Sequence, residues 1–255
     1  MGVKNMLDLT GKVALITGGS RGLGLQIGEA LGEMGAKLVI TARKAAGLEQ
    51  ACAHFGKLGV AVTPITCDLS KPESIPSMVE KAIEQHGRID ILVNNAGATW
   101  SAPAAEHPLE GWQKVLNLNL TAAFVVTQEV ARRSMIPNHY GRIINIASVA
   151  GLRGGYFRYI AYSTSKAGAI NFTRALASEW GQYNITVNAI APGTFAAGMM
   201  KDKVDQVRDM VVARTPLGRL GDDEDLKGVA VLLASDASRY ITGQVIAVDG
   251  GNSVT

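Results

Sequence analysis

Length, composition and charge confine this chain to a small set of protein classes. It has 255 residues, 47% of them hydrophobic, which is enough for one large α/β domain with a substantial core. No apolar run approaches the roughly 18 residues that span a bilayer, and residues 1–10 lack the cationic start and apolar core of an export signal. The formal net charge of +3 is too small and too dispersed for a nucleic-acid-binding protein.

Cysteine and histidine are sparse, and their spacing bears on metal binding and on compartment. The two cysteines, Cys52 and Cys67, fit a reducing compartment and simple burial. The four histidines are scattered, and the spacing of a metal-ligand motif is absent. We therefore expect a cytoplasmic protein that binds no metal, no membrane and no nucleic acid.

Short apolar runs rich in β-formers alternate along the chain with longer helical patterns. The expected strands cover residues 13–17, 37–41, 61–67, 89–93, 142–147, 185–191 and 245–248. The expected helices cover a segment that ends near residue 34, residues 48–58, a segment opened by Pro72, and residues 109–117, 121–134, 161–180 and 223–234. This alternation implies right-handed crossovers and a parallel sheet covered by helices on both faces. Because no internal repeat or linker interrupts it, we expect residues 1–255 to form a single domain.

The first expected strand runs into a glycine-rich turn. Residues 17–24 read Thr-Gly-Gly-Ser-Arg-Gly-Leu-Gly at a strand-to-helix junction. Glycines let the backbone approach a pyrophosphate, and the N-terminus of the following helix offers free N–H groups and a positive dipole. Many glycine-rich stretches are only tight turns, but the flanking strand and helix are the context that dinucleotide binding requires. The candidate contacts are Gly18, Ser20, Arg21, Gly22, Leu23 and Gly24.

The end of the second expected strand indicates which dinucleotide is bound. A site selective for NAD usually has an acidic residue there, which holds the ribose 2′-hydroxyl. This chain has Thr41-Ala42-Arg43-Lys44 instead, without a carboxylate. Arg43, together with Arg21 from the glycine turn, can hold a 2′-phosphate through guanidinium hydrogen bonds. The alternative is that both are ordinary solvated arginines, but the agreement of two positions favours NADP(H).

A tyrosine and a lysine four residues apart mark the expected catalytic helix. On a helix, Tyr162 and Lys166 leave the same face one turn apart. A free tyrosine has a pKa near 10 and stays protonated at neutral pH, but a nearby ammonium favours its phenolate. Such a tyrosine can give a proton to a carbonyl oxygen or take one from an alcohol, and Ser148, fourteen residues earlier, would hold the same oxygen. The same spacing also fits a surface tyrosine beside a surface lysine, so the other motifs must decide.

Seven motifs in order make the chain resemble the short-chain dehydrogenase/reductase family over nearly its whole length. They are residues 17–24, Asp68, residues 94–97, Asn119, Ser148, the pair Tyr162 and Lys166, and Pro192 with Gly193. The resemblance implies a single-domain Rossmann fold, an α/β doubly wound parallel sheet of about seven strands with helices on both faces. It also implies an NADP(H)-dependent oxidoreductase that acts on a CH–OH group.

The resemblance assigns roles to individual residues. The catalytic tetrad would be Asn119, Ser148, Tyr162 and Lys166, with Asn119 holding a water that passes protons onward and Lys166 also binding the nicotinamide ribose. Further cofactor contacts would come from residues that follow the third, fourth and sixth expected strands and from the catalytic helix. These are Asp68, Leu69, Asn95, Ala96, Gly97, Tyr162, Lys166, Pro192 and Gly193.

One position departs from the family pattern. The family often has a threonine four residues past the glycine of the Pro-Gly pair, bonded to the cofactor, and this chain has Ala197 there. Thr194 lies nearby as an alternative donor. We expect residues 194–215 to form a mobile flap over the substrate.

The substrate site is expected after residues 94–97, before the tyrosine and in the flap. The candidate lining residues are Trp100, Arg153, Tyr156, Phe157 and Phe195. Their aromatic rings suggest an apolar wall, and the alternative is that they pack against one another. Basic residues near the site fit the docking of acyl carrier protein or of coenzyme A phosphates, and fit a solvated face or a subunit contact equally well.

The pattern is most similar to 3-oxoacyl-[acyl-carrier-protein] reductases. We therefore expect the interconversion of a ketone and a secondary alcohol, with a 3-oxoacyl thioester carried on acyl carrier protein or coenzyme A as the substrate. Two alternatives stay open: a sugar-acid or polyol dehydrogenase of the gluconate 5-dehydrogenase kind, and a non-catalytic NADP-binding redox sensor. The resemblance also implies a homotetramer formed through residues 121–134, residues 161–180 and the last strand.

Overall fold

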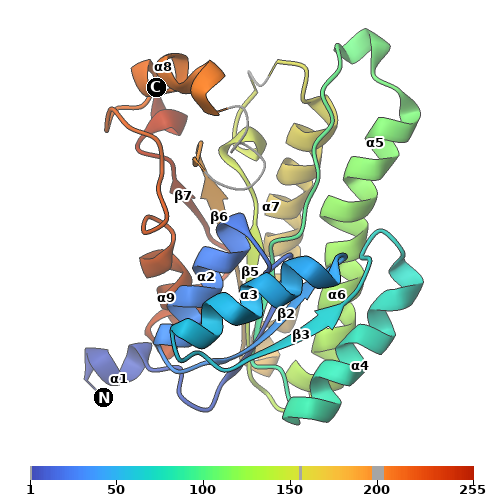
Figure 1. Cartoon of the computed structure of the whole chain (residues 1–255), viewed down its shortest axis with the longest axis vertical. Helices are drawn as coiled ribbons and strands as arrows, with labels where there is room; N and C mark the ends of the chain where they lie inside the picture. Colours follow the sequence, from blue (N-terminus) through green and yellow to red (C-terminus); the bar gives the residue numbers. More distant parts are fainter. Residues whose placement is uncertain (1, 155–156, 197–203) are drawn as a thin grey trace.

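A seven-stranded, all-parallel sheet forms the centre of the molecule (Figure 1). The computed structural model describes residues 2–154, 157–196 and 204–255. The strand order is β3-β2-β1-β4-β5-β6-β7, which is the predicted doubly wound Rossmann arrangement. The strands are β1 (Val13–Thr17), β2 (Lys37–Ala42), β3 (Val62–Thr66), β4 (Ile91–Asn94), β5 (Gly141–Ile146), β6 (Ile185–Pro192) and β7 (Val245–Val248).

Helices connect the strands and cover both faces of the sheet (Figure 1). The helices α2 (Gly22–Glu33), α3 (Ala45–Lys57) and α9 (Lys227–Ala234) pack on one face. The helices α4 (Ile75–His86), α6 (Ala122–Val130) and α7 (Ile160–Trp180) pack on the other. The remaining described α-helices are α1 (Val3–Leu7), α5 (Leu109–Leu116) and α8 (Val204–Ala213).

Side chains of the central strands alternate between the two faces. In β1, Ala14 and Ile16 belong to the core beneath α2, α3 and α9, whereas Val13 and Leu15 belong to the core beneath α4, α6 and α7. A strand buried on both faces needs an apolar side chain at nearly every position rather than at every second one. This explains why the strands appear in the sequence as unbroken apolar runs.

The strand order places the functional residues. Moving outward from the centre, the chain proceeds from β1 through β2 to β3 in one direction and from β4 through β5 to β7 in the other. In a parallel sheet the loops after β1 and β4 therefore diverge and leave a crevice at the carboxyl ends of these strands. The glycine turn follows β1, and residues 94–97 follow β4, so both border this crevice.

Residues 109–135 form one continuous helical segment, although the sequence predicts two helices separated at residues 118–120. The π-helical turn Asn117–Thr121 joins α5 to α6, and a second π-helical turn, Ala131–Met135, directly follows α6. A π turn adds one residue without breaking the helix, and such turns often occur at functional sites. The first of them contains Asn119.

The helices α1 and α8 were not predicted. Helix α8 lies within residues 194–215, the range expected to be a flap, and residues 197–203 of that range lie outside the described residues. Within the described ranges, no helix has both the length and the apolar character needed to cross a membrane.

Candidate functional site

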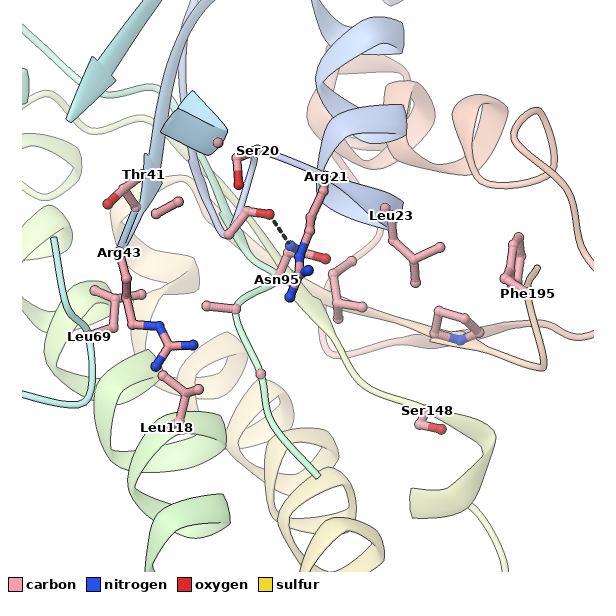
Figure 2. A pocket seen from close by; sticks show the side chains of 18 of the residues that line it. Ser20, Arg21, Leu23, Thr41, Arg43, Leu69, Asn95, Leu118, Ser148 and Phe195 are labelled. Atoms are coloured by element: carbon pink, nitrogen blue, oxygen red, sulfur yellow. Dashed lines mark hydrogen bonds between the residues drawn. The ribbon is translucent and has the colours of Figure 1, made fainter. Parts of the chain in front are cut away.

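A cavity of about 530 Å³ opens at the carboxyl ends of the strands (Figure 2). It brings together side chains from the glycine turn, from the ends of β2, β4, β5 and β6, and from α7. Its lining residues are Gly18, Ser20, Arg21, Gly22, Leu23, Thr41, Ala42, Arg43, Lys44, Gly47, Gln50, Cys67, Leu69, Asn95, Ala96, Gly97, Leu118, Ile146, Ala147, Ser148, Tyr162, Lys166, Pro192, Gly193 and Phe195.

The glycine turn leaves no room for side chains. Gly18 and Gly22 have φ values of +65° and +56°, in the left-handed region that favours glycine. A Cβ at Gly24 would lie 2.4 Å from Asn95 Nδ2 and 2.6 Å from the carbonyl oxygen of Gly18. Helix α2 begins at Gly22, so its free backbone N–H groups and positive dipole end face the cavity. The turn is therefore built as an anion cradle.

Asn95 holds this cradle in place. Its Nδ2 donates hydrogen bonds to the carbonyl oxygens of Thr17 (2.9 Å) and Gly18 (3.0 Å), and its backbone N–H donates to Thr17 Oγ1 (3.0 Å). These bonds tie the loop after β4 to the turn after β1 across the crevice. Asn95 thus has the bracing position that the resemblance implies.

Cations gather at the end of β2. Arg43 and Lys44 follow this strand, both exposed, and Arg21 belongs to the glycine turn. Figure 2 shows the Arg21 and Arg43 side chains extending into the cavity from these two elements. Among the described lining residues there is no aspartate or glutamate. The electrostatics of this end therefore favour an anionic group over a neutral hydroxyl.

Asp68 lies beside the cavity but does not line it, although its neighbours Cys67 and Leu69 do. Its carboxylate accepts hydrogen bonds from the hydroxyl (2.7 Å) and the backbone N–H (3.1 Å) of Ser70. The Ser70 hydroxyl bond is the main cause that lowers the pKa of Asp68, with a smaller electrostatic contribution from Arg43. Asp68 is therefore an ionised group next to the cavity, near Arg43.

Ser148, Tyr162 and Lys166 all line the cavity, at its other end. Ser148 follows β5, and its Oγ accepts a hydrogen bond from the backbone N–H of Ala150 (3.1 Å). A Cβ at Gly151 would lie 2.5 Å from the backbone of Lys166, so this glycine lets the turn that carries Ser148 approach α7. The fold thus brings together three residues that the sequence predicts as catalytic.

Lys166 is the most deeply buried cation of the cavity lining. Its side chain is 5% exposed, and its Nζ donates a hydrogen bond to the carbonyl oxygen of Ile146 (2.6 Å). The same Nζ lies 5.6 Å from the centre of the Tyr162 ring. Burial lowers the pKa of Lys166 from 10.5 to about 8, because the ammonium loses its hydration.

Asn119, the fourth predicted catalytic residue, lies behind the cavity lining. Its Oδ1 accepts from the backbone N–H of Ala98 (2.8 Å), and its Nδ2 donates to the carbonyl oxygen of Ala98 (3.0 Å) and to Ser165 Oγ (2.9 Å). These three bonds join the loop after β4 to α7 through the π turn. The neighbouring Leu118, which sequence reasoning missed, does line the cavity.

The end of β6 supplies the remaining predicted cofactor residues, Pro192 and Gly193. The Gly193 N–H donates to the carbonyl oxygen of Val248 (2.9 Å), and a Cβ there would lie 2.8 Å from Asp249. Phe195, predicted for the substrate site, is 4% exposed and lines the cavity.

The other predicted substrate residues lie elsewhere or outside the described residues. Trp100 packs on Gly111 of α5, and Lys114 Nζ lies 5.2 Å from its ring centre. Arg153 donates hydrogen bonds to the chain's last residues, and Phe157 is 80% exposed. Tyr156 falls outside the described residues, as does Ala197.

Several lining residues escaped the sequence analysis because they belong to no motif. Except for Leu118, which lies in the π turn, they lie at strand ends or in the first half of α3, and this position is the signal that could have found them. They are Thr41, Ala42, Lys44, Gly47, Gln50, Cys67, Leu118, Ile146 and Ala147. In the described part of the chain, no group of three or more histidine, cysteine, aspartate or glutamate residues is arranged to hold a metal ion.

The chain is similar to known proteins over nearly its whole length. The sequence model of the family described as enoyl-(acyl carrier protein) reductase matches residues 18–253. The chain is 42% identical to the 2-dehydro-3-deoxy-D-gluconate 5-dehydrogenase of Dickeya dadantii, over 98% of each chain. It is 38% identical to a 3-oxoacyl-[acyl-carrier-protein] reductase of Vibrio cholerae, over 96% of this chain and 98% of that one.

A solved structure shares both fold and sequence with this chain. A gluconate 5-dehydrogenase from Burkholderia cenocepacia, solved with NADP and tartrate, superposes with a TM-score of 0.94 at 34% identity and covers 100% of both chains. Together with the match over residues 18–253, these similarities show that the chain belongs to the short-chain dehydrogenase/reductase family, a family of oxidoreductases acting on CH–OH groups.

Proposed function

We propose that this protein is an NADP(H)-dependent oxidoreductase that interconverts a ketone and a secondary alcohol. The observation that carries the proposal is the presence of Ser148, Tyr162 and Lys166 in the same cavity as the glycine turn and Arg43. One end of this cavity is suited to bind a phosphorylated dinucleotide, and the other end is suited to move a proton.

The residues present fit NADP(H). The pyrophosphate would lie on the glycine turn at the N-terminus of α2, where Gly24 lets the helix pack closely against Gly18 and Asn95. The 2′-phosphate would be held by Arg43 and Arg21. When bound, the nicotinamide supplies or accepts the hydride at the substrate carbon. The Burkholderia relative solved with NADP supports the same choice of cofactor.

The proton chemistry belongs to this chain's own residues. In ketone reduction, Tyr162 donates its hydroxyl proton to the carbonyl oxygen, and the Ser148 hydroxyl donates a hydrogen bond to the same oxygen. The Lys166 ammonium, fixed by the carbonyl oxygen of Ile146, favours the tyrosinate that proton transfer leaves behind. Asn119 fixes the loop after β4 against α7, the helix that carries Tyr162 and Lys166, and so helps to keep these side chains in position.

A 3-oxoacyl thioester, carried on acyl carrier protein or coenzyme A, is the substrate class we propose. The exposed fractions of Leu152, Phe157 and Ile160 are 42%, 80% and 42%. All three residues lie between Ser148 and Tyr162 in the chain. None of the three lines the cavity, but exposed apolar side chains in the segment that links Ser148 to Tyr162 suit an acyl chain better than a polyol. The Vibrio cholerae relative supports the same class.

A sugar acid is the second candidate substrate. The support is the 42% identity with the 2-dehydro-3-deoxy-D-gluconate 5-dehydrogenase of Dickeya dadantii and the similarity to the Burkholderia gluconate 5-dehydrogenase. The two candidates differ in the chains attached to the reacting carbon: an acyl chain and a methylene that leads to a thioester in one, and hydroxylated carbons that lead to a carboxylate in the other.

The deciding assay follows NADPH absorbance with purified protein. We expect oxidation of NADPH with acetoacetyl-CoA and no reduction of NADP with gluconate. Turnover of gluconate alone would replace the proposed substrate by the second candidate. NADPH binding without turnover of any ketone or alcohol would instead support a redox sensor and contradict the proposed chemistry.

We also infer a homotetramer built through α6, α7 and β7. Phe124 of α6 is 46% exposed and makes an edge-to-face contact with Phe172 of α7, with ring centres 6.4 Å apart. On α7, Ile170 and Leu176 are buried in the monomer, while Phe172 and Trp180 are only half-buried. The strand β7 ends the sheet, so its outer edge is open to a second copy. A cytoplasmic location stays a prediction from the sequence.

A further inference from the structure

Three segments distant in sequence meet beside the end of the cavity that Ser148 and Gly193 line. They are residues 149–154, which follow Ser148, residues 214–217, which follow α8, and residues 249–255, which follow β7. We call residues 249–255 the C-terminal segment. It starts beside Gly193, whose N–H donates to the carbonyl oxygen of Val248.

The C-terminal segment has a defined shape. The carboxylate of Asp249 accepts hydrogen bonds from the backbone N–H groups of Gly251 (3.0 Å) and Ser253 (2.6 Å). Gly250 and Gly251 have φ values of +63° and +88°, which let the chain turn back against Pro216. The segment borders a second cavity of about 450 Å³, and Phe195 lines both this cavity and the one described above.

Arg153 joins the C-terminal segment to the loop after Ser148. Its Nη1 donates to the carbonyl oxygen of Thr255 (2.6 Å), and its Nη2 donates to Asn252 Oδ1 (2.9 Å). The guanidinium fork thus makes two bonds in one plane, which fix direction as well as distance. Lysine could not reproduce this geometry.

Asn252 extends the connection to the end of α8. Its Nδ2 donates to the carbonyl oxygen of Arg214 (3.0 Å), and the hydroxyl of Thr255 donates to the same oxygen (3.3 Å). Asn252 and Thr255 accept the hydrogen bonds of Arg153, and both therefore also bond to the carbonyl oxygen of Arg214. The segment before Tyr162 and the segment after α8 are connected through only a few side chains.

We propose that Arg153 is a positioning residue, which sets the substrate side of the site by fixing the loop after Ser148 to the C-terminal segment through Asn252 and Thr255. This inference rests on the proposed ketone–alcohol function, and it replaces the direct substrate contact expected for Arg153 from the sequence. Its effect falls on the loop that carries the exposed Leu152, and not on the glycine turn.

The kinetic test compares Arg153→Met, Asn252→Ala, the double variant and Arg153→Lys with any ketone that the wild-type enzyme reduces. We expect each single variant to raise KM for the ketone by about three- to ten-fold, because each loses hydrogen bonds of a charged group. The kcat and the KM for NADPH should change little. The double variant should be hardly worse than either single variant, because both break the same connection. Arg153→Lys should recover only part of the loss.

Arg239→Ala provides a matched control. Arg239 is an exposed arginine that precedes β7, so it lies toward the amino ends of the strands, away from the cavity at their carboxyl ends. It should leave all constants unchanged. A rise in the ketone KM with Arg153→Met but not with Asn252→Ala would show direct substrate contact and overturn the proposal.

Amide hydrogen exchange tests the connection without any substrate. Backbone amides of residues 149–154 should exchange faster in both Arg153→Met and Asn252→Ala than in the wild-type protein and in Arg239→Ala. Unchanged exchange in both variants would overturn the inference. Absence of turnover with every ketone would instead contradict the proposed function and leave this measurement to decide the inference.

Discussion

Lys166 is a buried cation, and we propose that its role is in catalysis and not in stability. Replacing it with methionine keeps a similar volume but removes the ammonium that favours the tyrosinate of Tyr162. We expect a loss of activity of about 100- to 10,000-fold, the usual contribution of positioned proton transfer. Steady-state rates with NADPH and a ketone that the wild-type enzyme reduces measure this effect. Activity within a few-fold of the wild type would contradict the role of Lys166.

The same variant gives a stability signature with a definite sign. Because the pKa of Lys166 falls from 10.5 to about 8 on folding, the unfolded chain binds more protons at this position between these pH values. This group therefore makes the free energy of unfolding of the wild-type protein rise with pH across that window, by up to about 3 kcal/mol. Urea unfolding at pH 8 and at pH 10 should show this rise reduced in Lys166→Met. The variant Lys57→Met, at an exposed lysine of α3, should retain it.

Arg43 is the residue that most directly reports the choice of cofactor. It is exposed at the end of β2, in a cavity lining where the described residues include no carboxylate. Arg43→Asp should move the preference from NADP(H) toward NAD(H), because an acid repels the 2′-phosphate and accepts a bond from the ribose 2′-hydroxyl. Dissociation constants for both cofactors measure the change. Equal affinity of the wild-type protein for both would refute the assignment.

The π turn Asn117–Thr121 is the element that organises the catalytic end of the site. Asn119→Ala removes three hydrogen bonds to Ala98 and Ser165, and should lower the free energy of unfolding by about 3 kcal/mol and reduce kcat together. Ser165→Ala removes one of these three and the bond from Ser165 Oγ to the carbonyl oxygen of Tyr162, and should cost about 2 kcal/mol. Urea unfolding and steady-state kinetics on both variants provide the comparison. If Asn119→Ala is as stable as the wild type, the bracing role is wrong.

The elements that the sequence predicts best are short apolar runs that end at a turn signal. The strands β1 and β7 occur at the predicted residues, because their apolar runs end at glycine or at aspartate followed by glycine. The fourth strand begins two residues later than predicted. The backbone N–H and carbonyl oxygen of Ile89 both bond to Ser134 Oγ, so this residue stays outside the ladder. Such a distant partner leaves no local signal.

Across the whole molecule, the site residues also divide into those that local sequence motifs predict and those whose positions depend on distant partners. The motif residues converge because parallel strands bring their carboxyl ends to one edge, which the order of motifs in the chain predicts. The substrate residues were harder to predict because their partners are distant in sequence. Arg153 bonds to residues about 100 positions away, and Trp100 packs on Gly111 in a contact that no spacing rule specifies.

Assembly is the prediction that concerns the molecule as a whole. If α6, α7 and β7 form the interfaces, light scattering in dilute buffer should give a mass near four times the 26.8 kDa of one chain. Phe124→Glu should lower this mass, because it places a charge in an apolar interface. Phe124→Leu, which stays apolar, should not. A wild-type mass near 26.8 kDa would reject the tetramer.

The most direct test of the proposed chemistry is Tyr162→Phe, which removes one hydroxyl from the cavity and leaves the ring that faces Lys166. NADPH affinity, measured by fluorescence titration, should stay within a few-fold of the wild type, since the glycine turn and Arg43 are untouched. Ketone reduction in the same preparation should fall by about 100- to 10,000-fold. Retention of wild-type turnover with NADPH bound would contradict Tyr162 as the proton donor and, with it, the proposed mechanism.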